Sequence, residues 1–275
     1  MLRKHLSLFA SLGFAALVFV SVAAHAQVLG TASDFAVLGG TAGITNTGPS
    51  LVTGSVGVWP AASITGFPPG LIVPGTGSFH RADAVAQQAQ ADTSAAYLTL
   101  AGLTGASIAP ALGGQSLTPG IYNAGSANLT GTLTLNGPGL YVIQTSALTT
   151  ASGPGASSVS LINGATPCDV FWQVGSSAAI GTFSAVQGNI LALTSITLGT
   201  SASLQGRALA RNGTVTLDSN AVTACSGGTT PGFIVPAIVP APPPVSTPTL
   251  SQWAIIALTL LIALVGFTAI GRRNT

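Results

Sequence analysis

The chain has 275 residues, only 4% of them charged, and a formal net charge of +2. Residues 27–249 contain no Glu and no Lys, and their five Asp and three Arg leave a net charge of −2. Because this stretch offers no basic surface, we expect no nucleic-acid partner.

Residues 1–26 are typical of a secretory signal peptide. A basic start at residues 3–5 precedes an apolar run from Leu6 to Val22, and Ala24-His25-Ala26 has the small-x-small pattern of a cleavage site. We therefore expect a mature chain that starts at Gln27. The alternative is an uncleaved membrane anchor.

Residues 27–225 form the predicted folded domain, and one segment of it is typical of a helix. From Arg81 to Leu100 there is no Gly or Pro, and small apolar side chains recur at helical spacing. We expect one amphipathic helix over about 81–101, lying against a flat wall. The predicted stripe consists of Val85, Ala89, Ala96 and Leu100, with Ala86 and Tyr97 beside it.

The rest of the domain consists of short apolar runs broken by Gly, Pro and Asn, and it contains an internal repeat. Gln187-Gly188 returns as Gln205-Gly206 after 18 residues, and 196–198 (ITL) return as 215–217 (VTL) after 19. A period of this length fits a coil of three short strands, stacked on the next coil at about 4.8 Å. The pattern therefore predicts a mainly β, three-sided solenoid with one long α-helix packed alongside.

Within these coils we expect the apolar residues to point inward and the small polar ones outward. The run 129–135 (LTGTLTL) alternates cleanly, which predicts three threonines on one side and three leucines on the other. An outer-membrane barrel is the rival architecture, but it needs more aromatic residues than this body has. The predicted inward residues are Leu191, Ile196, Leu198, Leu204, Val215 and Leu217.

Cys168 and Cys225 are the two cysteines of the chain. An even pair in an exported protein predicts a disulfide, which would contribute about 4 kcal/mol by closing a long loop. A metal pair or a nucleophile would need neighbouring ligands or a base, and no such cluster is visible in the sequence.

The titratable residues argue against catalysis. His80 is the single histidine of the body, and we expect it to pair with Asp83 at the start of the helix. The other aspartates are scattered without a carboxylate pair, and no phosphate loop or metal-ligand spacing occurs. Arg207 and Arg211 lie in one coil and are expected to pair with an Asp or a loop. We expect no enzyme activity, no metal and no cofactor.

The C-terminal part predicts a linker followed by a membrane segment. Residues 226–249 contain seven prolines, which indicates a stiff, extended linker. Trp253 to Ile270 carries no charge and is followed by Arg272-Arg273, as in a membrane-spanning helix with a cytoplasmic end. The alternative is a buried core helix. Residues 250–275 are thus the predicted C-terminal segment, and both terminal apolar helices lie outside the domain.

A series of motifs in the domain resembles the widespread microbial ice-binding family known as DUF3494. The resemblance implies a discontinuous right-handed β-helix with a long helix beside it, one flat side that binds ice, and no catalytic residues. We accordingly expect an ice surface as partner and a monomer. The motifs are Leu29–Gly39, Ile44–Pro49, Ile64–Gly70, Ala82–Ala86, Leu117–Tyr122, Val170–Ser176, Gly188–Ala192 and Gly206–Ala210.

The family often carries a Thr-x-x-Thr-like pattern on the ice-binding side, and degraded versions occur here. They are residues 182–185, 200–203 and 219–222, with 52–55 as a weaker match. A row of hydroxyl and methyl groups without charge suits ordered water, although Thr and Ser are also common on any exposed strand. The candidate ice-binding residues are Thr53, Ser55, Thr182, Ser184, Thr200, Ser201, Ser203, Ser219 and Asn220.

Residues 247–253 (TPTLSQW), with the apolar run and Arg272-Arg273, resemble the IPTL-type C-terminal sorting signal. This implies export from a Gram-negative-type bacterium to the cell surface or medium, with transient anchoring in the inner membrane. Two other functions stay open. One is an adhesin or structural module that binds polysaccharide or another cell, and the other is a β-helix lyase or hydrolase, which the missing carboxylate cluster disfavours.

Overall fold

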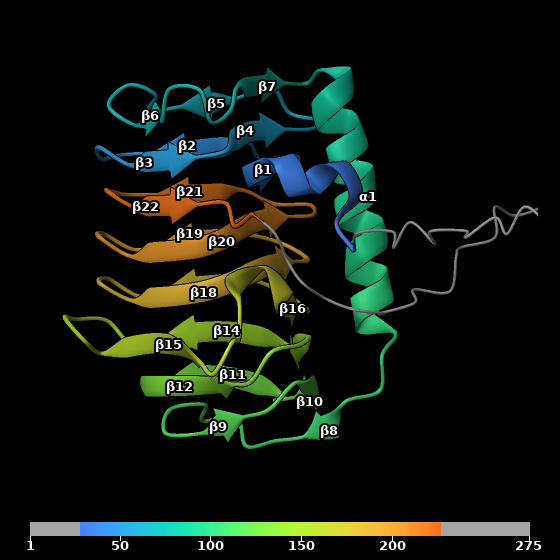
Figure 1. The fold of residues 1–275 in the computed structure, drawn as a ribbon. Helices are drawn as coiled ribbons and strands as arrows, with labels where there is room; N and C mark the ends of the chain where they lie inside the picture. Colours follow the sequence, from blue (N-terminus) through green and yellow to red (C-terminus); the bar gives the residue numbers. More distant parts are fainter. Residues whose placement is uncertain (1–27, 227–275) are drawn as a thin grey trace, which may run out of the picture. The chain divides into compact units, whose positions relative to one another are not determined.

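The structure is a computed structural model that describes residues 28–226 (Figure 1). The predicted signal peptide (1–26), the C-terminal segment (250–275) and all but the first residue of the linker (226–249) lie outside this range. None of the helices in the described range is long and apolar enough to span a membrane.

All strand pairs in the domain are parallel, and the strands form one sheet of seven and one of fifteen. Each strand of the seven-stranded sheet comes from a different coil of the chain, so the coils stack on one another (Figure 1). In stacking order this sheet contains β11 (Ser126–Leu129), β14 (Ala147–Thr150), β17 (Ala178–Ile180), β19 (Ile196–Leu198), β21 (Val215–Leu217), β2 (Ile44–Asn46) and β5 (Ile64–Thr65).

The fifteen-stranded sheet has two rows, which the long strands β18 and β20 join. The first, the open row, contains β9 (Ser116–Leu117), β12 (Gly131–Asn136), β15 (Ser157–Ile162), the first halves of β18 (Ala185–Ala192) and β20 (Ser203–Ala210), β22 (Ala221–Thr223), β3 (Leu51–Thr53) and β6 (Leu71–Ile72). The second, the helix row, contains β8 (Ala106–Ser107), β10 (Gly120–Asn123), β13 (Tyr141–Thr145), β16 (Val170–Val174), the second halves of β18 and β20, β1 (Phe35–Gly39), β4 (Ser55–Val58) and β7 (Phe79–Arg81).

The stacking order does not follow the chain order. Strands β1, β2 and β3 from the start of the domain pair with β20, β21 and β22 from its end. Helix α1 (Ala84–Ala101) then leads from β7 back to β8 at the opposite end of the stack (Figure 1). The first coils therefore depend on the last ones for their hydrogen-bond partners.

The predicted repeat is confirmed by the register of the strands. Gln187 and Gly188 pair with Gln205 and Gly206, and Ile196 pairs with Val215. Gly188 and Gly206 both have positive φ, and a Cβ on Gly206 would lie 1.9 Å from the carbonyl oxygen of Gly188. The Gln-Gly pair thus recurs because only glycine fits where the open row bends into the helix row.

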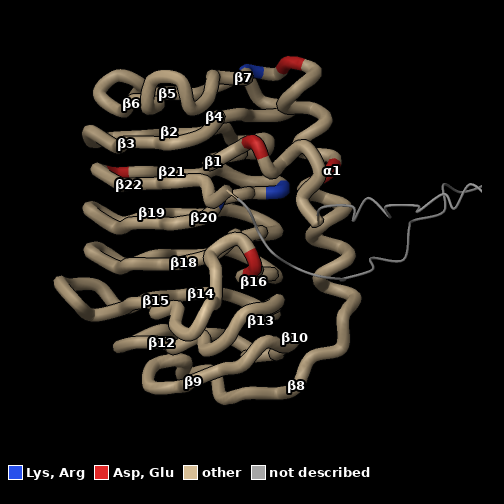
Figure 2. Tube along the Cα trace, in the orientation of Figure 1, with Lys and Arg blue, Asp and Glu red and all other residues tan. Residues whose placement is uncertain are grey.

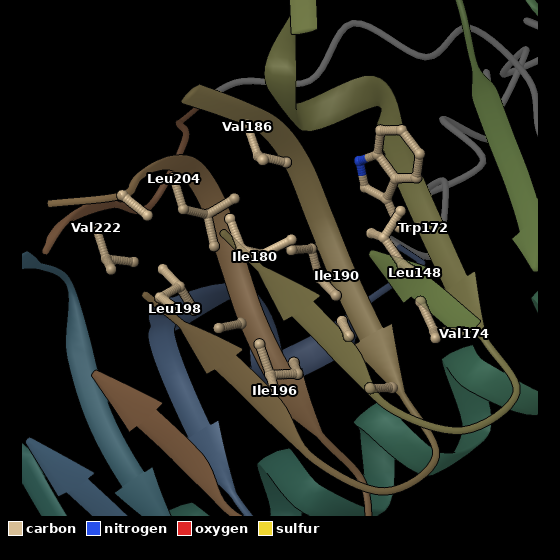
Figure 3. Packing of buried hydrophobic residues seen from close by; sticks show 14 of the residues in the cluster. Leu148, Trp172, Val174, Ile180, Val186, Ile190, Ile196, Leu198, Leu204 and Val222 are labelled. Atoms are coloured by element: carbon tan, nitrogen blue, oxygen red, sulfur yellow. The ribbon is translucent and has the colours of Figure 1, made fainter. Parts of the chain in front are cut away.

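The interior enclosed by the two rows and the seven-stranded sheet is filled by stacked apolar side chains (Figure 3). Five of the six residues predicted to point inward are part of this core, namely Ile196, Leu198, Leu204, Val215 and Leu217. Leu191 is also buried, but it belongs to a second cluster between the helix row and α1, so its predicted direction was wrong. Its strand neighbours Ile190 and Ala192 fill the interior instead, because side chains alternate along a strand.

The alternation in residues 129–135 has a different origin from the one predicted. The three leucines are buried, but β11 ends at Leu129 and β12 begins at Gly131, whose φ is +88°. Thr130 therefore lies at a corner, while Thr132 and Thr134 lie on the open row. The threonines do not share one side, because a glycine turn interrupts the strand.

Helix α1 ends at the predicted residue but begins at Ala84, three residues after the predicted start, because Arg81 still belongs to β7. The Asp83 carboxylate accepts a hydrogen bond from the Ala86 N–H at 2.8 Å and contacts Nδ1 of His80 at 2.8 Å, which confirms the predicted pair. These contacts lower the pKa of Asp83, the backbone hydrogen bond from Ala86 most of all. Val85 is half exposed, so its predicted place in the buried stripe was wrong. The polar residues Gln90 and Thr93 occupy that stripe, with Ala86, Ala89, Ala96, Tyr97 and Leu100.

Two contacts fasten the end of the domain to its beginning. Cys168 and Cys225 form the predicted disulfide. Arg207, only 4% exposed, donates to the carbonyl oxygens of Ser33 and Cys225 and to Oδ1 of Asn189. Arg207 thus contacts loops, as one of its predicted alternatives had it, while Arg211 donates to Ser94 of α1. Short 3₁₀ turns at Gly30–Asp34 and Pro167–Asp169 carry the chain into this region.

Candidate functional site

The outer surface of the seven-stranded sheet carries one residue per strand in continuous register. Its seven members pair one with the next along the whole sheet, and five of them are threonine. Six of them are flanked on both sides by buried residues, and Thr65, the last residue of β5, follows the buried Ile64, so these side chains point outward. At about 4.8 Å per strand, the column extends over about 29 Å. This threonine column consists of Asn128, Thr149, Ala179, Thr197, Thr216, Thr45 and Thr65.

The hydroxyl groups in the middle of the threonine column are available to solvent. Thr45, Thr197 and Thr216 make no side-chain hydrogen bond with another residue of the range 28–226. Among the outer members, Thr149 and Thr65 donate to the carbonyl oxygens of Ala127 and Ile44 at 3.4 Å. Thr149 Oγ1 also accepts a hydrogen bond from Asn128 Nδ2 at 3.1 Å. Since Thr is β-branched, its rotamer is restricted, and the column presents a regular alternation of hydroxyl and methyl groups.

Charge is distributed unevenly over the domain. Strands of the seven-stranded sheet and of the open row contain no charged residue at an outward position. Most charged positions lie near α1, and Figure 2 shows this concentration on the helix side. The threonine column therefore lies on a surface that is polar and uncharged.

Asp218 directly follows β21 and lies at the corner between the seven-stranded sheet and the open row. The Thr200 hydroxyl donates to its carboxylate at 2.5 Å and Ser219 at 3.1 Å. These hydrogen bonds, above all that from Thr200, lower the pKa of Asp218. Phe183, Ser201 and Ser219 occupy equivalent corner positions in three coils, and all have positive φ.

Residues 37–223 match the family described as ice-binding-like. The chain belongs to this ice-binding-like family. It is 47% identical over 234 residues to an ice-binding protein of Nostoc sp. (strain HG1), covering 80% of this chain and 82% of that one. An ice-binding protein of Flavobacterium frigoris (strain PS1) is 33% identical over 214 residues, covering 71% and 75%. Residues 246–274 match the IPTL-CTERM motif.

Solved structures of family members share the fold. The ice-binding protein of the Antarctic ascomycete Antarctomyces psychrotrophicus aligns with a TM-score of 0.67 at 39% identity, covering 72% of this chain and 98% of that one. The DUF3494 domain of Shewanella frigidimarina ice-binding protein 1 aligns with a TM-score of 0.63 at 28% identity, covering 72% and 97%. The sequence resemblance to this family is therefore confirmed.

The nine candidate residues predicted from the family pattern do not share one surface. Thr182, Thr200, Ser201 and Ser219 lie at the corner beside the threonine column, whereas Thr53 and Ser203 lie on the open row. Ser55 begins β4 in the helix row. Most residues of the predicted pattern therefore lie in the turns between strands and not at the centres of strands.

Two of the predicted candidates lie inside the domain and cannot contact a surface ligand. Ser184 is 1% exposed and bonds to the hydroxyl of Thr150, and Asn220 is 2% exposed and donates to the carbonyl oxygens of Gly199 and Ala202. Their prediction as surface residues was wrong, because both side chains turn inward to satisfy the backbone of the corner.

The members of the threonine column were absent from the predicted candidates, although the sequence carries a signal for them. In the repeat, 196–198 (ITL) and 215–217 (VTL) place a threonine between two inward residues. The same arrangement occurs at Ile44-Thr45-Asn46 and Ile64-Thr65, but these coils lie far away in sequence. Only the stacking of β2 on β21 brings the two pairs into one column.

Other chemistry finds little support among the described residues. No three His, Cys, Asp or Glu side chains of residues 28–226 lie close enough together to hold a metal ion. Trp172 is fully buried, and its indole N–H donates to the Gln187 carbonyl oxygen. Trp172 therefore lies in the core, within strand β16, and offers no surface for a ligand.

Proposed function

We propose that this protein binds ice through the outer surface of the seven-stranded sheet, with the threonine column at its centre, and that it performs no catalysis. The observation that carries the proposal is the register of the column. Seven outward residues from coils distant in sequence lie in one line, and no charged side chain interrupts the strands that carry them.

The physical basis is the repeated pairing of a hydroxyl with a methyl group. The methyl groups order neighbouring water into cages, and the hydroxyl groups hold that water in place by hydrogen bonds. Because the strands are fixed by parallel pairing and the threonine rotamers are restricted, little conformational entropy is lost on binding. Charged side chains would order water in a pattern that an ice lattice does not share.

The relatives support the same function, since the proteins of Nostoc and Flavobacterium frigoris are both named ice-binding proteins. We further propose that the coils form the discontinuous right-handed β-helix expected for this family. Bound to ice, the protein would slow crystal growth or recrystallisation, or attach a cell to ice. The IPTL-CTERM match supports export to the surface of a Gram-negative-type cell.

The open row is the alternative ice-binding surface, since it carries the predicted candidates Thr53 and Ser203. Its outward residues are less uniform, because Ser203 pairs with Ala221, which pairs with Leu51 and then Leu71. Leu51 and Leu71 are both at least half exposed. Between the two surfaces lie the corner residues Thr182, Thr200, Ser201 and Ser219, which would enlarge whichever surface binds ice.

The test compares a bulky substitution on each surface. In the proposed face, Thr216→Tyr places a ring above the middle of the threonine column and should reduce thermal hysteresis and ice-crystal shaping several-fold. Thr223→Tyr, on an exposed strand of the open row, is the matched control and should leave both unchanged. The Thr200→Tyr variant at the corner should have an intermediate effect.

Circular dichroism and melting temperature establish that each variant is folded before ice is measured. A loss of ice shaping in Thr223→Tyr, with Thr216→Tyr unaffected, would move the site to the open row. If the folded wild-type protein neither shapes ice nor inhibits recrystallisation, the ice-binding proposal itself is wrong.

A further inference from the structure

A cleft of about 350 Å³ lies beside helix α1, away from the threonine column. It is lined by residues of α1 and by the turns that lead from the helix row to the seven-stranded sheet, among them Trp59, Gln90, Arg211 and Asn212. Its volume is at the lower end of the range for small-molecule sites. The cleft is shallow and largely open to solvent, so it can admit one residue of a longer polymer.

The side chain of Gln90 has one amide atom, Oε1, that lacks a hydrogen-bond partner. The side chain is only 6% exposed, and its Nε2 donates to the carbonyl oxygens of Ala210 and Arg211 at 2.9 and 2.5 Å. Its Oε1 accepts no hydrogen bond from the described residues. A buried acceptor without a donor is unfavourable, but this oxygen is inaccessible to solvent and therefore lies in the wall of the cleft, behind the surface that a ligand contacts.

Arg211 brings a positive charge without a carboxylate partner. Its Nε donates to Ser94 Oγ at 3.3 Å, and its guanidinium carbon lies 5.5 Å from the ring centre of Tyr97. The ion pair of His80 with Asp83 does not involve Arg211, and the contacts of Arg211 with Ser94 and Tyr97 include no carboxylate. Its terminal N–H groups are thus free to bind a carboxylate in the bidentate geometry that arginine favours.

Trp59 contributes a partly exposed aromatic ring. Its backbone N–H donates to the Gly39 carbonyl oxygen at 3.1 Å, which holds the residue in place. Its indole N–H makes no hydrogen bond with a described residue, unlike that of Trp172. The ring therefore offers both an apolar surface and a donor, the combination on which a sugar ring packs.

We propose that this cleft binds an acidic sugar residue, a uronate within an extracellular polysaccharide. The carboxylate would pair with Arg211, and the sugar ring would pack on Trp59. A neutral sugar would leave Arg211 without an anion, and a simple carboxylate would not use the aromatic ring. The same protein would then hold polysaccharide on its helix side while the threonine column stays free.

The experiment measures binding of trigalacturonate and of neutral maltotriose to the purified full chain by isothermal titration calorimetry. Trigalacturonate should bind, and its affinity should fall with rising salt because an ion pair is screened. Arg211→Gln should weaken this binding at least ~10-fold, which is about 1.4 kcal/mol at 25 °C. Arg81→Gln, at an exposed arginine on β7, is the matched control and should change nothing.

A second readout is independent of any destabilisation by the arginine variant. In the ¹⁵N NMR spectrum, the indole signal that disappears in Trp59→Phe should shift on adding trigalacturonate, while that of buried Trp172 should not. Absence of binding to the wild-type protein, or equal affinity for maltotriose that Arg211→Gln leaves unchanged, would overturn the proposal. Thr216→Tyr should retain the sugar, so failure of the ice-binding proposal and failure of this one are distinguishable.

Discussion

The helix row and the seven-stranded sheet are built from the same coils, yet their outward residues have opposite character. Leu191 and Thr197 belong to one coil, and Leu209 and Thr216 belong to the next. The two leucines are fully buried against α1 and its surroundings, whereas the two threonines face solvent. Whether an outward position holds an apolar or a polar residue therefore depends on whether another layer of the protein covers it, and not on the geometry of the strand.

The two regions are therefore expected to have different roles, one in stability and the other in binding. The helix row contributes to stability because α1 and the N-terminal segment remove its apolar side chains from water. The threonine column contributes little to stability and remains available for a partner. Substitutions in the two regions should therefore affect the free energy of unfolding very differently, and the following predictions are ordered by that effect.

The largest effect is expected from the crosslink that closes the helix side. Replacing both Cys168 and Cys225 by Ala should lower the free energy of unfolding by about 4 kcal/mol, because the unfolded chain gains the entropy of a long open loop. Urea unfolding followed by circular dichroism measures this. A loss below about 1 kcal/mol would mean that Arg207 and its carbonyl partners already hold the chain end without the disulfide.

Truncation under the helix should come next. Leu209→Ala removes a fully buried side chain between β20 and α1 and should cost about 3 kcal/mol of unfolding free energy. Leu98→Ala is the matched control, because Leu98 lies on the exposed side of the same helix. Equal losses in the two variants would contradict the assignment of the helix row as the stabilising side.

A smaller, pH-dependent effect is expected at the start of α1. Asp83→Ala removes the helix cap and should cost about 1 kcal/mol at neutral pH. Because the folded-state pKa of Asp83 is lowered, its charge stabilises the protein above its unfolded pKa of about 4, and this contribution is lost as pH falls further.

Asp83→Asn separates the charge of that cap from its hydrogen bond, since Asn is also a good cap. The melting temperature of the wild type should exceed that of the Asn variant at neutral pH, and the two should converge in acid. A difference that persists at pH 2 would show that the carboxylate charge is not its cause.

The smallest effect on stability is expected on the threonine column. Thr197→Val preserves the shape of the side chain and removes its hydroxyl, so the free energy of unfolding should change by less than about 0.5 kcal/mol. Ice-crystal shaping should nevertheless weaken, less than with a tyrosine. Thr223→Val on the open row serves as control, and equal ice shaping in all three proteins would show that the hydroxyl plays no part.

Particular residues show how far prediction from the sequence can reach. The Gln-Gly repeat predicted the register of β18 on β20, because a glycine required by backbone geometry recurs in these two successive coils. The cap at Asp83 and the disulfide were predictable for similar reasons, since each depends on residue type and short-range or covalent chemistry. Val85 was misplaced because hydrophobicity alone does not reveal that Gln90 bonds to Ala210 across the helix–sheet contact.

The candidate site was less predictable than the fold. The stretches 182–185 and 219–222 resemble the family pattern, but Ser184 and Asn220 turn inward to bond with the backbone of the corner. A shift of one residue exchanges the two sides of a strand, so a pattern located in turns does not identify the exposed surface.

The coil, its period and its apolar interior can be derived from the amino-acid sequence, because they follow from local alternation and from glycine at fixed positions. Which outward residues meet in one column depends instead on how distant coils stack. Thr45 and Thr65 join Thr197 and Thr216 because β2 stacks on β21, a pairing between the first and last parts of the domain. Likewise, α1 decides that Leu191 is covered while Thr197, in the same coil, is left to the solvent.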